Sequence, residues 1–232
     1  IPGVPGVGGV SLFPLQGMGS NGGYVLLDRP DEIANRADRA RIASDASRTG
    51  VAEFRVASEE YFGAMGIPLR SGRVFDARDT RDAPHVAVIS ATFAEARWPG
   101  QDPLGRLVNF SGMDGDFRAL TIVGVVGDIQ EIEIGAMPQP MLYVDVRQRP
   151  GGANEFHVVI QGEGDFARAA REISRELDPQ IPVAFRTLRD VVSTWMAQRQ
   201  FVLVLLGLFG ALALVLAATG VYGIVGYRAV RR

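Results

Sequence analysis

Few side chains in this sequence could carry out acid–base or metal chemistry, and they are scattered. The two histidines, His85 and His157, each lie beside apolar residues typical of strands, and there is no cysteine. Histidines in such runs are more often structural than catalytic, so we interpret both as structural. Without cysteine, disulfides, a cysteine-based zinc site and a thiol nucleophile are excluded.

Acidic residues recur at two places where a cation could be considered. Asp76, Asp79 and Asp82 are spaced three apart, but the alternation and the glycine of a calcium loop are missing, so we expect a solvated charged loop. Glu131 and Glu133 alternate with isoleucines, as on an exposed strand face. The sequence therefore predicts no metal site.

Sequence signatures of hydrolysis and phosphate binding are also missing. There is no H-E-x-x-H, G-x-S-x-G or P-loop pattern, and "GVVGD" at 124–128 is typical of a strand that enters a tight turn. The formal net charge of −2 gives no basic surface for nucleic acid. We predict no catalytic residue, no cofactor and no nucleic-acid partner.

Short apolar runs and amphipathic runs alternate along residues 1–190. They predict strands near 7–13, 51–57, 85–90, 140–146, 155–161 and 182–188. They also predict a short helix capped by Ser58 and stopped at Gly66, a helix over 91–98 capped by Ser90, and a helix capped by Asp165. Residues 17–23 are expected to form a loop, and residues 28–50 a polar surface excursion.

Two local signals make sharper predictions. Asp114-Gly115 stands between two apolar runs, which predicts the turn of a β-hairpin. Thr187 and Asp190 have the spacing of a capping box, although Asp replaces the usual Glu. Because no proline follows, one helix is expected to run from about 188 to 227, with its first part standing outside the membrane as a stalk.

The run from Phe201 to Tyr227 carries no charged side chain, and a bilayer core needs about 20 apolar residues in a helix. We therefore predict a membrane span. The positive-inside rule places the C-terminus in the cytoplasm and residues 1 to about 200 outside the inner membrane. The predicted interface residues are Trp195, Arg199, Tyr227, Arg228, Arg231 and Arg232.

Small residues recur four apart within this run, a spacing that lets a second helix approach closely. Glycine is also common in membrane helices in general, so the pattern supports helix packing without requiring it. The predicted packing residues are Gly207, Ala211, Ala213, Ala217, Thr219 and Gly223.

Five ordered stretches resemble the MacB-like, FtsX-related family of ABC transporter permeases, and most closely its large orphan permeases of acidobacteria and similar soil bacteria. These stretches are "EYFGAMGIPLRSGRVFDARDT", "VAVISATFAEARWPGQDPLGRLV", "TIVGVVGDI", "LDPQIPVAFRTL" and "FGALALVLAATGVYGIVGYRAVRR". The resemblance implies an α+β fold with a mixed sheet. It divides the chain into a porter-like subdomain (1–84 and 152–190), an inserted subdomain (85–151), a stalk and transmembrane helix (188–227) and a cytoplasmic start (228–232).

The same resemblance implies a function and partners. Such permeases work as dimers with an ATP-binding subunit or domain and couple ATP hydrolysis to movement of their periplasmic part. The chain would then be a non-catalytic transmitting segment. The sequence identifies no exported substrate and does not show whether a periplasmic or outer-membrane partner exists. The alternative is a single-pass, membrane-anchored receptor or binding module; a membrane-anchored enzyme lacks a candidate site.

Overall fold

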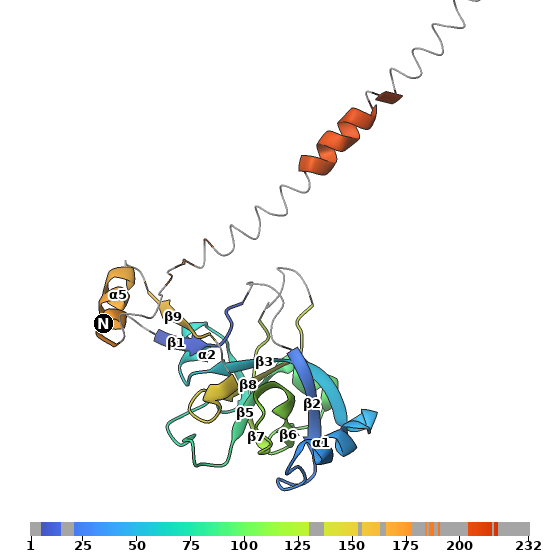
Figure 1. Cartoon of the computed structure of the whole chain (residues 1–232), viewed down its shortest axis with the longest axis vertical. Coiled ribbons are helices and arrows are strands. Elements are labelled where there is room, and N and C mark those ends of the chain that lie inside the picture. The colour runs from blue at the N-terminus through green and yellow to red at the C-terminus, as the bar shows by residue number, and fades with distance from the viewer. Residues whose placement is uncertain are drawn as a thin grey trace, which may run out of the picture. The chain divides into compact units, whose positions relative to one another are not determined.

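The computed structural model describes residues 6–14, 21–129, 137–152, 155–162, 166–177, 184, 186, 187, 190, 204–214, 216 and 217. The chain divides into two compact units, residues 1–183 and 184–232, which we describe separately (Figure 1). The strands of the first unit are β1 (Gly6–Val10), β2 (Asn21–Leu27), β3 (Thr49–Ala57), β4 (Leu69–Gly72), β5 (Val86–Ser90), β6 (Leu107–Asn109), β7 (Leu120–Val126), β8 (Met141–Asp145) and β9 (His157–Gln161). Its helices are α1 (Arg36–Ala43), α2 (Tyr61–Ala64), α3 (Ala91–Arg97), α4 (Ser111–Asp114) and α5 (Phe166–Leu177), with 3₁₀ turns at Ala46–Arg48 and Pro150–Gly152.

Six of these strands pair in a closed ring, in the order β2, β6, β7, β5, β8, β3 and back to β2. The pairs β5–β7 and β3–β8 are parallel, and the other four pairs of the ring are antiparallel. Beyond the ring, β1 pairs with the end of β3, β9 pairs with β1, and β4 pairs with β7. A mixed sheet with short helices confirms the predicted α+β class. The predicted division at residues 85 and 151 stays a prediction. Strands from both predicted parts pair in this one sheet.

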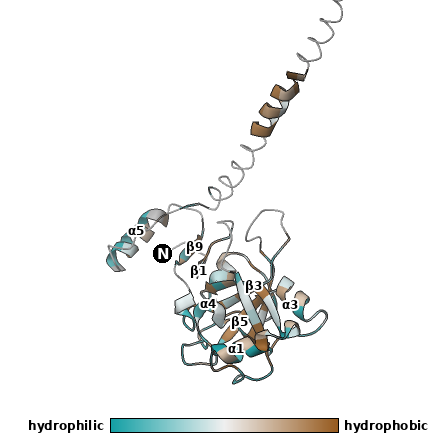
Figure 2. Ribbon diagram, turned by 45° about the vertical axis from the view of Figure 1, so that its right-hand side comes forward, coloured by the Kyte–Doolittle hydropathy of each residue, from teal (hydrophilic) through white to brown (hydrophobic). Residues whose placement is uncertain are grey.

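Alternating side chains along the strands form two apolar clusters. One cluster takes a buried residue from each strand of the ring and therefore fills its interior: Tyr24, Phe54, Ile89, Val108, Ile122 and Leu142. The intervening residues Val88 and Tyr143 point the other way, into a second cluster with Phe62 and Phe75. In Figure 2 the central strand β5 is accordingly coloured as hydrophobic. Burial on both faces explains why β5 and β8 read as continuous apolar runs.

Several predicted caps are confirmed. The Ser90 hydroxyl accepts a hydrogen bond from the Phe93 N–H and begins α3. Gly66 follows α2 with a φ of 68°, the left-handed conformation that glycine adopts most readily. In the second unit, the Thr187 hydroxyl accepts from the Asp190 N–H at 3.1 Å, and the Asp190 carboxylate accepts from the Thr187 N–H at 3.2 Å. This reciprocal pair is the predicted capping box.

The hairpin turn was predicted wrongly. Strands β6 and β7 do pair antiparallel, but Asp114 ends the helical turn α4 and Gly115 is its C-terminal cap, with a φ of 75°. The reason lies at Asn109, whose side-chain oxygen accepts from the N–H of Ser111 at 3.1 Å and from its hydroxyl at 2.7 Å. These bonds start a helical turn where a tight hairpin was expected.

Three other predictions need correction. The Ser58 hydroxyl accepts from the Gly9 N–H of the neighbouring strand, so it ties β1 to α2 and does not cap the helix. Strand β2 begins at Asn21, inside the predicted loop. Within the polar stretch 28–50, helix α1 buries Ile42 and is capped by Asn35.

Gly124 in β7 lies where β4 approaches most closely, and this contact gives a first testable prediction. A Cβ atom there would lie 1.9 Å from the Arg73 carbonyl oxygen, whereas a Cβ at Gly63 in α2 would meet nothing within 4 Å. We expect Gly124→Ala to lower the free energy of unfolding by about 1–3 kcal/mol, because the backbone must shift. The matched Gly63→Ala should leave it unchanged or raise it slightly. Urea titrations followed by circular dichroism compare the two; equal stabilities would contradict the close contact.

Candidate functional site

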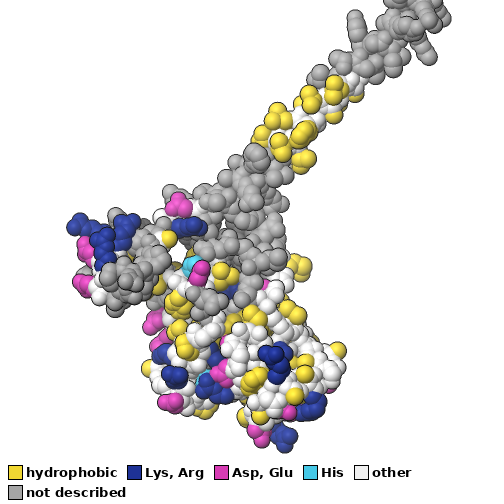
Figure 3. All heavy atoms as spheres, in the orientation of Figure 1, with side chains coloured by type: hydrophobic (Ala, Val, Ile, Leu, Met, Phe, Trp, Pro, Cys, Tyr) yellow, Lys and Arg dark blue, Asp and Glu magenta, His cyan; other side chains and the backbone are white. Residues whose placement is uncertain are grey.

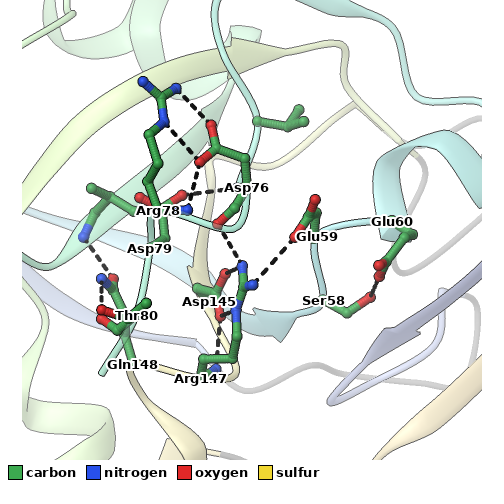
Figure 4. Close-up of polar contacts among 12 residues, drawn as sticks. Ser58, Glu59, Glu60, Asp76, Arg78, Asp79, Thr80, Asp145, Arg147 and Gln148 are labelled. Carbon is green, nitrogen blue, oxygen red and sulfur yellow. Dashed lines mark hydrogen bonds and ion pairs between the residues drawn. The ribbon is translucent and has the colours of Figure 1, made fainter. Parts of the chain in front are cut away.

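Charged residues gather where β3 and β8 end and β5 begins, and the turn after β8, residues 145–149, is their centre (Figure 4). We call this cluster the arginine junction. The guanidinium of Arg147 donates to both oxygens of Asp145, at 3.1 and 2.7 Å. It also donates to the Glu59 carboxylate at 3.2 Å and to the Asp76 carbonyl at 2.8 Å. One side chain therefore ties the end of β8 to the turn before α2 and to the loop after β4.

Gln148, the next residue, connects the turn after β8 to the start of β5. The Gln148 side-chain oxygen accepts from the Val86 N–H at 2.9 Å. Its amide nitrogen donates to the carbonyls of Thr80 and Pro84, at 3.1 and 3.3 Å. The loop from Asp76 to Pro84 is thus held against the turn after β8 by two consecutive side chains.

This loop is the stretch for which a solvated charged surface was expected, and for Asp79 that expectation was wrong. The Asp79 carboxylate is buried and accepts two hydrogen bonds from Arg73, at 2.6 and 2.8 Å. It also accepts from the Asp76 N–H at 2.9 Å, which bends the loop back on itself. A paired and hydrogen-bonded carboxylate can be buried where an isolated one could not. Asp82 is exposed, as expected.

The second arginine of the turn makes the most buried contacts of the junction. Arg149 and Asp114 pair at 2.8 Å with side chains only 1% and 2% exposed. Arg149 also donates to the carbonyls of Asp116 and Arg118, at 3.0 and 2.7 Å, and to Nδ1 of His85 at 2.8 Å. Buried and hydrogen-bonded, His85 fits the structural role predicted for it.

The electrostatics of the junction are those of permanent ion pairs. Hydrogen bonds to Asp145 raise the pKa of Arg147, and hydrogen bonds from Arg78 hold the pKa of Asp76 well below its ordinary value. Burial acts to raise the pKa of Asp116, but hydrogen bonds from Arg118 outweigh it and lower that pKa to about 2. These groups keep their charges near neutral pH. The junction can therefore hold segments together through these charged pairs.

The other predicted residues lie elsewhere. His157 is on β9, partly exposed, 3.9 Å from the Glu155 carboxylate. Asp128 follows β7, and its carboxylate accepts from the Thr92 N–H at the start of α3. Glu131, Glu133 and Asp165 lie outside the described residues. In the part of the chain that the structure describes, no three His, Asp or Glu side chains are grouped so that they could hold a metal ion.

In the second unit, residues 204–214, 216 and 217 are helical, with the exposed apolar side chains seen in Figure 3. Gly207, Ala211, Ala213 and Ala217 are on this helical stretch. The remaining predicted packing and interface residues lie outside the described residues: Thr219, Gly223, Trp195, Arg199, Tyr227, Arg228, Arg231 and Arg232. Among the described residues no helix reaches both the length and the apolar character needed to cross a membrane.

The first unit matches a known protein family. Residues 18–176 match the MacB-like periplasmic core domain. The chain belongs to this family. The arginine junction lies wholly within the matched residues.

Individual relatives carry the family's name. The chain is 27% identical over 134 residues to the macrolide export ATP-binding/permease protein MacB of Neisseria gonorrhoeae, a match that covers 52% of this chain and 20% of that protein. A MacB of Mannheimia succiniciproducens is 32% identical over 72 residues, or 31% of this chain and 10% of that one. The chain thus spans a fifth or less of the length of these relatives.

Solved structures of the same kind are also similar. The periplasmic region of MacB from Actinobacillus actinomycetemcomitans aligns with a TM-score of 0.49 at 18% identity, over 77% of this chain and 68% of that one. The extracellular domain of the ABC-type transporter YknZ from Gram-positive bacteria aligns with a TM-score of 0.45 at 16% identity, over 77% and 76% of the two chains.

The arginine junction was not predicted from the sequence. Arg147 and Arg149 stand in "DVRQRP", which looks like an ordinary exposed turn. The one available signal is that three charged residues, Asp145, Arg147 and Arg149, alternate directly after the apolar run "MLYV" at 141–144. That pattern does not tell which distant residues they meet.

Proposed function

We propose that this chain is the extracytoplasmic and membrane-spanning segment of an ABC transporter permease, which transmits ATP-driven conformational change across the inner membrane. The observation that carries the proposal is the match to the MacB-like periplasmic core domain over residues 18–176. The relatives named above are ATP-binding/permease proteins, so a partner that binds ATP belongs to the proposal.

The chain's own composition supports a separate source of ATP hydrolysis. All 24 of its basic residues are arginines, and a P-loop requires a lysine to contact the phosphates. We therefore assign ATP hydrolysis to another subunit or domain and propose a non-catalytic role for this chain in export or efflux.

The proposed topology follows from charge and length. Residues 1 to about 200 lie outside the inner membrane, one helix over about 188–227 forms the stalk and the span, and Arg228–Arg232 lie in the cytoplasm. Two permease halves pair as a homodimer or pseudo-dimer through the small residues from Gly207 to Gly223. The capping box of Thr187 and Asp190 supports a helix that begins here.

Transmission of force also requires a stiff outer part, and the arginine junction supports this. Arg147 fastens the turn before α2 and the loop after β4 to the end of β8. Charge-assisted bonds of a forked guanidinium fix geometry as well as distance. A movement applied to one side of this junction would therefore reach the other side with little loss.

The proposal is tested by following the outer part during ATP turnover. The chain has no cysteine, so Val51→Cys, at an exposed position of β3, carries a single spin label per copy. In the complete transporter, reconstituted with its ATP-binding part, we expect a dipolar coupling between two copies that changes when ATP replaces ADP. The control omits the ATP-binding part.

The possible outcomes separate the elements of the proposal. A coupling that changes when ATP replaces ADP would support transmission and contradict a single-pass receptor. A coupling that is present but insensitive to ATP would keep the dimer and reject transmission. Absence of any coupling would reject the dimer.

A further inference from the structure

His85 and Arg149 make an unusual contact, because it fixes the protonation state of the histidine. The Nε of Arg149 lies 2.8 Å from Nδ1 of His85. An arginine nitrogen is always a donor, so Nδ1 must be the acceptor and the ring must be neutral. His85 is also buried, with 4% of its surface exposed. The contact exists only while the imidazole carries no proton on Nδ1.

The charged groups around the ring keep it neutral. Burial makes the largest contribution to lowering the pKa of His85, and the positive charges of Arg149 and Arg118 lower that pKa further. The carboxylate of Asp116 and the backbone of Arg81 act in the opposite direction without reversing the shift. Asp114 does not compensate directly, because its carboxylate is bound to the other side of Arg149.

The same arginine holds one segment of the chain in place. Its remaining N–H groups bind the Asp114 carboxylate and the carbonyls of Asp116 and Arg118. All three acceptors lie in residues 111–118, between β6 and β7, which we call the 111–118 segment. The position of this segment therefore depends on the position of the Arg149 guanidinium, which His85 helps to fix from the opposite side.

We propose that the His85–Arg149 contact is an acid-sensitive latch that releases the 111–118 segment when the surroundings become mildly acidic. Protonation at Nδ1 would place two N–H donors and two positive charges at a separation of 2.8 Å, so the ring and the guanidinium must part. Histidine is the side chain whose ordinary pKa lies between pH 5 and 8. It therefore takes up a proton at a higher pH than Asp76 and Asp116 do, because ion pairs lower the pKa of both carboxylates.

The direction of the effect follows from the lowered pKa. The folded state binds the proton less readily than the unfolded or opened state does. The stabilisation by the latch is therefore complete above the ordinary histidine pKa of about 6.5 and is lost as the pH falls toward the folded-state value. The latch itself rests on the geometry of the contact. Only its exposure to changes in external pH rests on the proposed function, because that function places the domain outside the inner membrane.

Hydrogen exchange measured by mass spectrometry on the full chain tests the latch. At about pH 5 we expect the amides of the 111–118 segment to lose protection by as much as 30-fold relative to a His85→Asn variant, because each pH unit below 6.5 contributes a factor of ten at most. Asn places a carbonyl oxygen where Nδ1 stood, so it can accept from Arg149 at every pH. Comparing variants at the same pH cancels the intrinsic pH dependence of exchange.

His157→Asn is the matched control, since His157 is the only other histidine. We expect it to behave as the wild type and strands β2 and β3 to stay protected in all variants. Equal acid-induced loss in His85→Asn and wild type would overturn the proposal, as would a wild type that keeps full protection at pH 5. If all amides of His85→Asn are unprotected at neutral pH, the variant has not folded. His85→Gln, which also carries a non-titrating acceptor, then replaces it in the comparison. The readout needs no transport, so a failed latch and a failed transporter function are distinguishable.

Discussion

Replacing Arg149 with methionine is expected to lower the free energy of unfolding by about 3–5 kcal/mol, the cost of leaving one member of a buried ion pair behind. Methionine fills much of the volume but donates no hydrogen bond. The Asp114 carboxylate, 2% exposed, then loses its partner, and the carbonyls of Asp116 and Arg118 lose their donor. Such a loss is a large share of the 5–15 kcal/mol by which domains are usually stable. Urea unfolding followed by circular dichroism measures it.

An exposed arginine of the same segment supplies the control. Arg118 pairs with Asp116 at 2.5 Å, but its side chain is 57% exposed. Arg118→Met should therefore cost less than about 1 kcal/mol. The double variant Arg149→Met, Asp114→Asn should recover part of the stability, because the buried charge is gone. A loss in Arg149→Met no larger than that in Arg118→Met would show that the buried pair does not stabilise the fold.

The features that were predicted correctly from the sequence are contacts between residues close together in the chain. Ser90 caps α3 through a residue three positions away, and Thr187 and Asp190 are equally close. Strands β5 and β8 are short and almost entirely apolar, and each ends on a polar residue, so their existence follows from local composition. The family resemblance supplied the fold class, because it draws on the order of whole stretches rather than on single contacts.

The closed ring of strands could not be predicted from such signals. Its closure requires β2 to pair with β3 on one side and with β6 on the other, and nothing in "NGGYVLL" specifies either partner. The failed turn at Asp114-Gly115 shows the same limit. A local turn preference was outweighed by the bonds of Asn109 to Ser111 and by burial of Phe110.

The arginine junction escaped prediction because its partners are distant in the sequence. Arg147 meets Glu59 across 88 positions, and Arg149 meets His85 across 64. A charged residue in a polar turn is exposed more often than not, so burial of Asp79 and Arg149 contradicts the usual expectation. Only the fold, which brings the ends of β3 and β8 beside the start of β5, reveals why these charges are buried.

The conservative change Arg147→Lys should loosen the first unit without unfolding it. Lysine keeps the positive charge beside the fully buried Asp145, but its single ammonium cannot reproduce a fork that reaches Asp145, Glu59 and the Asp76 carbonyl together. The turn before α2 is then no longer fastened to the end of β8. We expect a wider spread of distances between α2 and α3, with a modest loss of stability of about 1–2 kcal/mol.

Two cysteines introduced into the cysteine-free chain measure this spread. Gly63→Cys in α2 and Glu95→Cys in α3 both place a label at an exposed position of a helix. Pulsed dipolar spectroscopy should give a narrow distribution with Arg147 and a clearly broader one with lysine. Arg78→Lys is the matched control, because Arg78 is 75% exposed and its ion pair with Asp76 should contribute little.

The same variant connects the junction to the proposed transporter. If the junction carries movement between the two sides, Arg147→Lys in the complete transporter should leave ATP hydrolysis intact and reduce the ATP-dependent change at the Val51→Cys label. Arg78→Lys should preserve both. An unchanged distance distribution in Arg147→Lys would show that the backbone pairing of β3 with β8 is stiff enough alone. A broadened distribution with a normal ATP response would instead place the path of transmission elsewhere in the sheet.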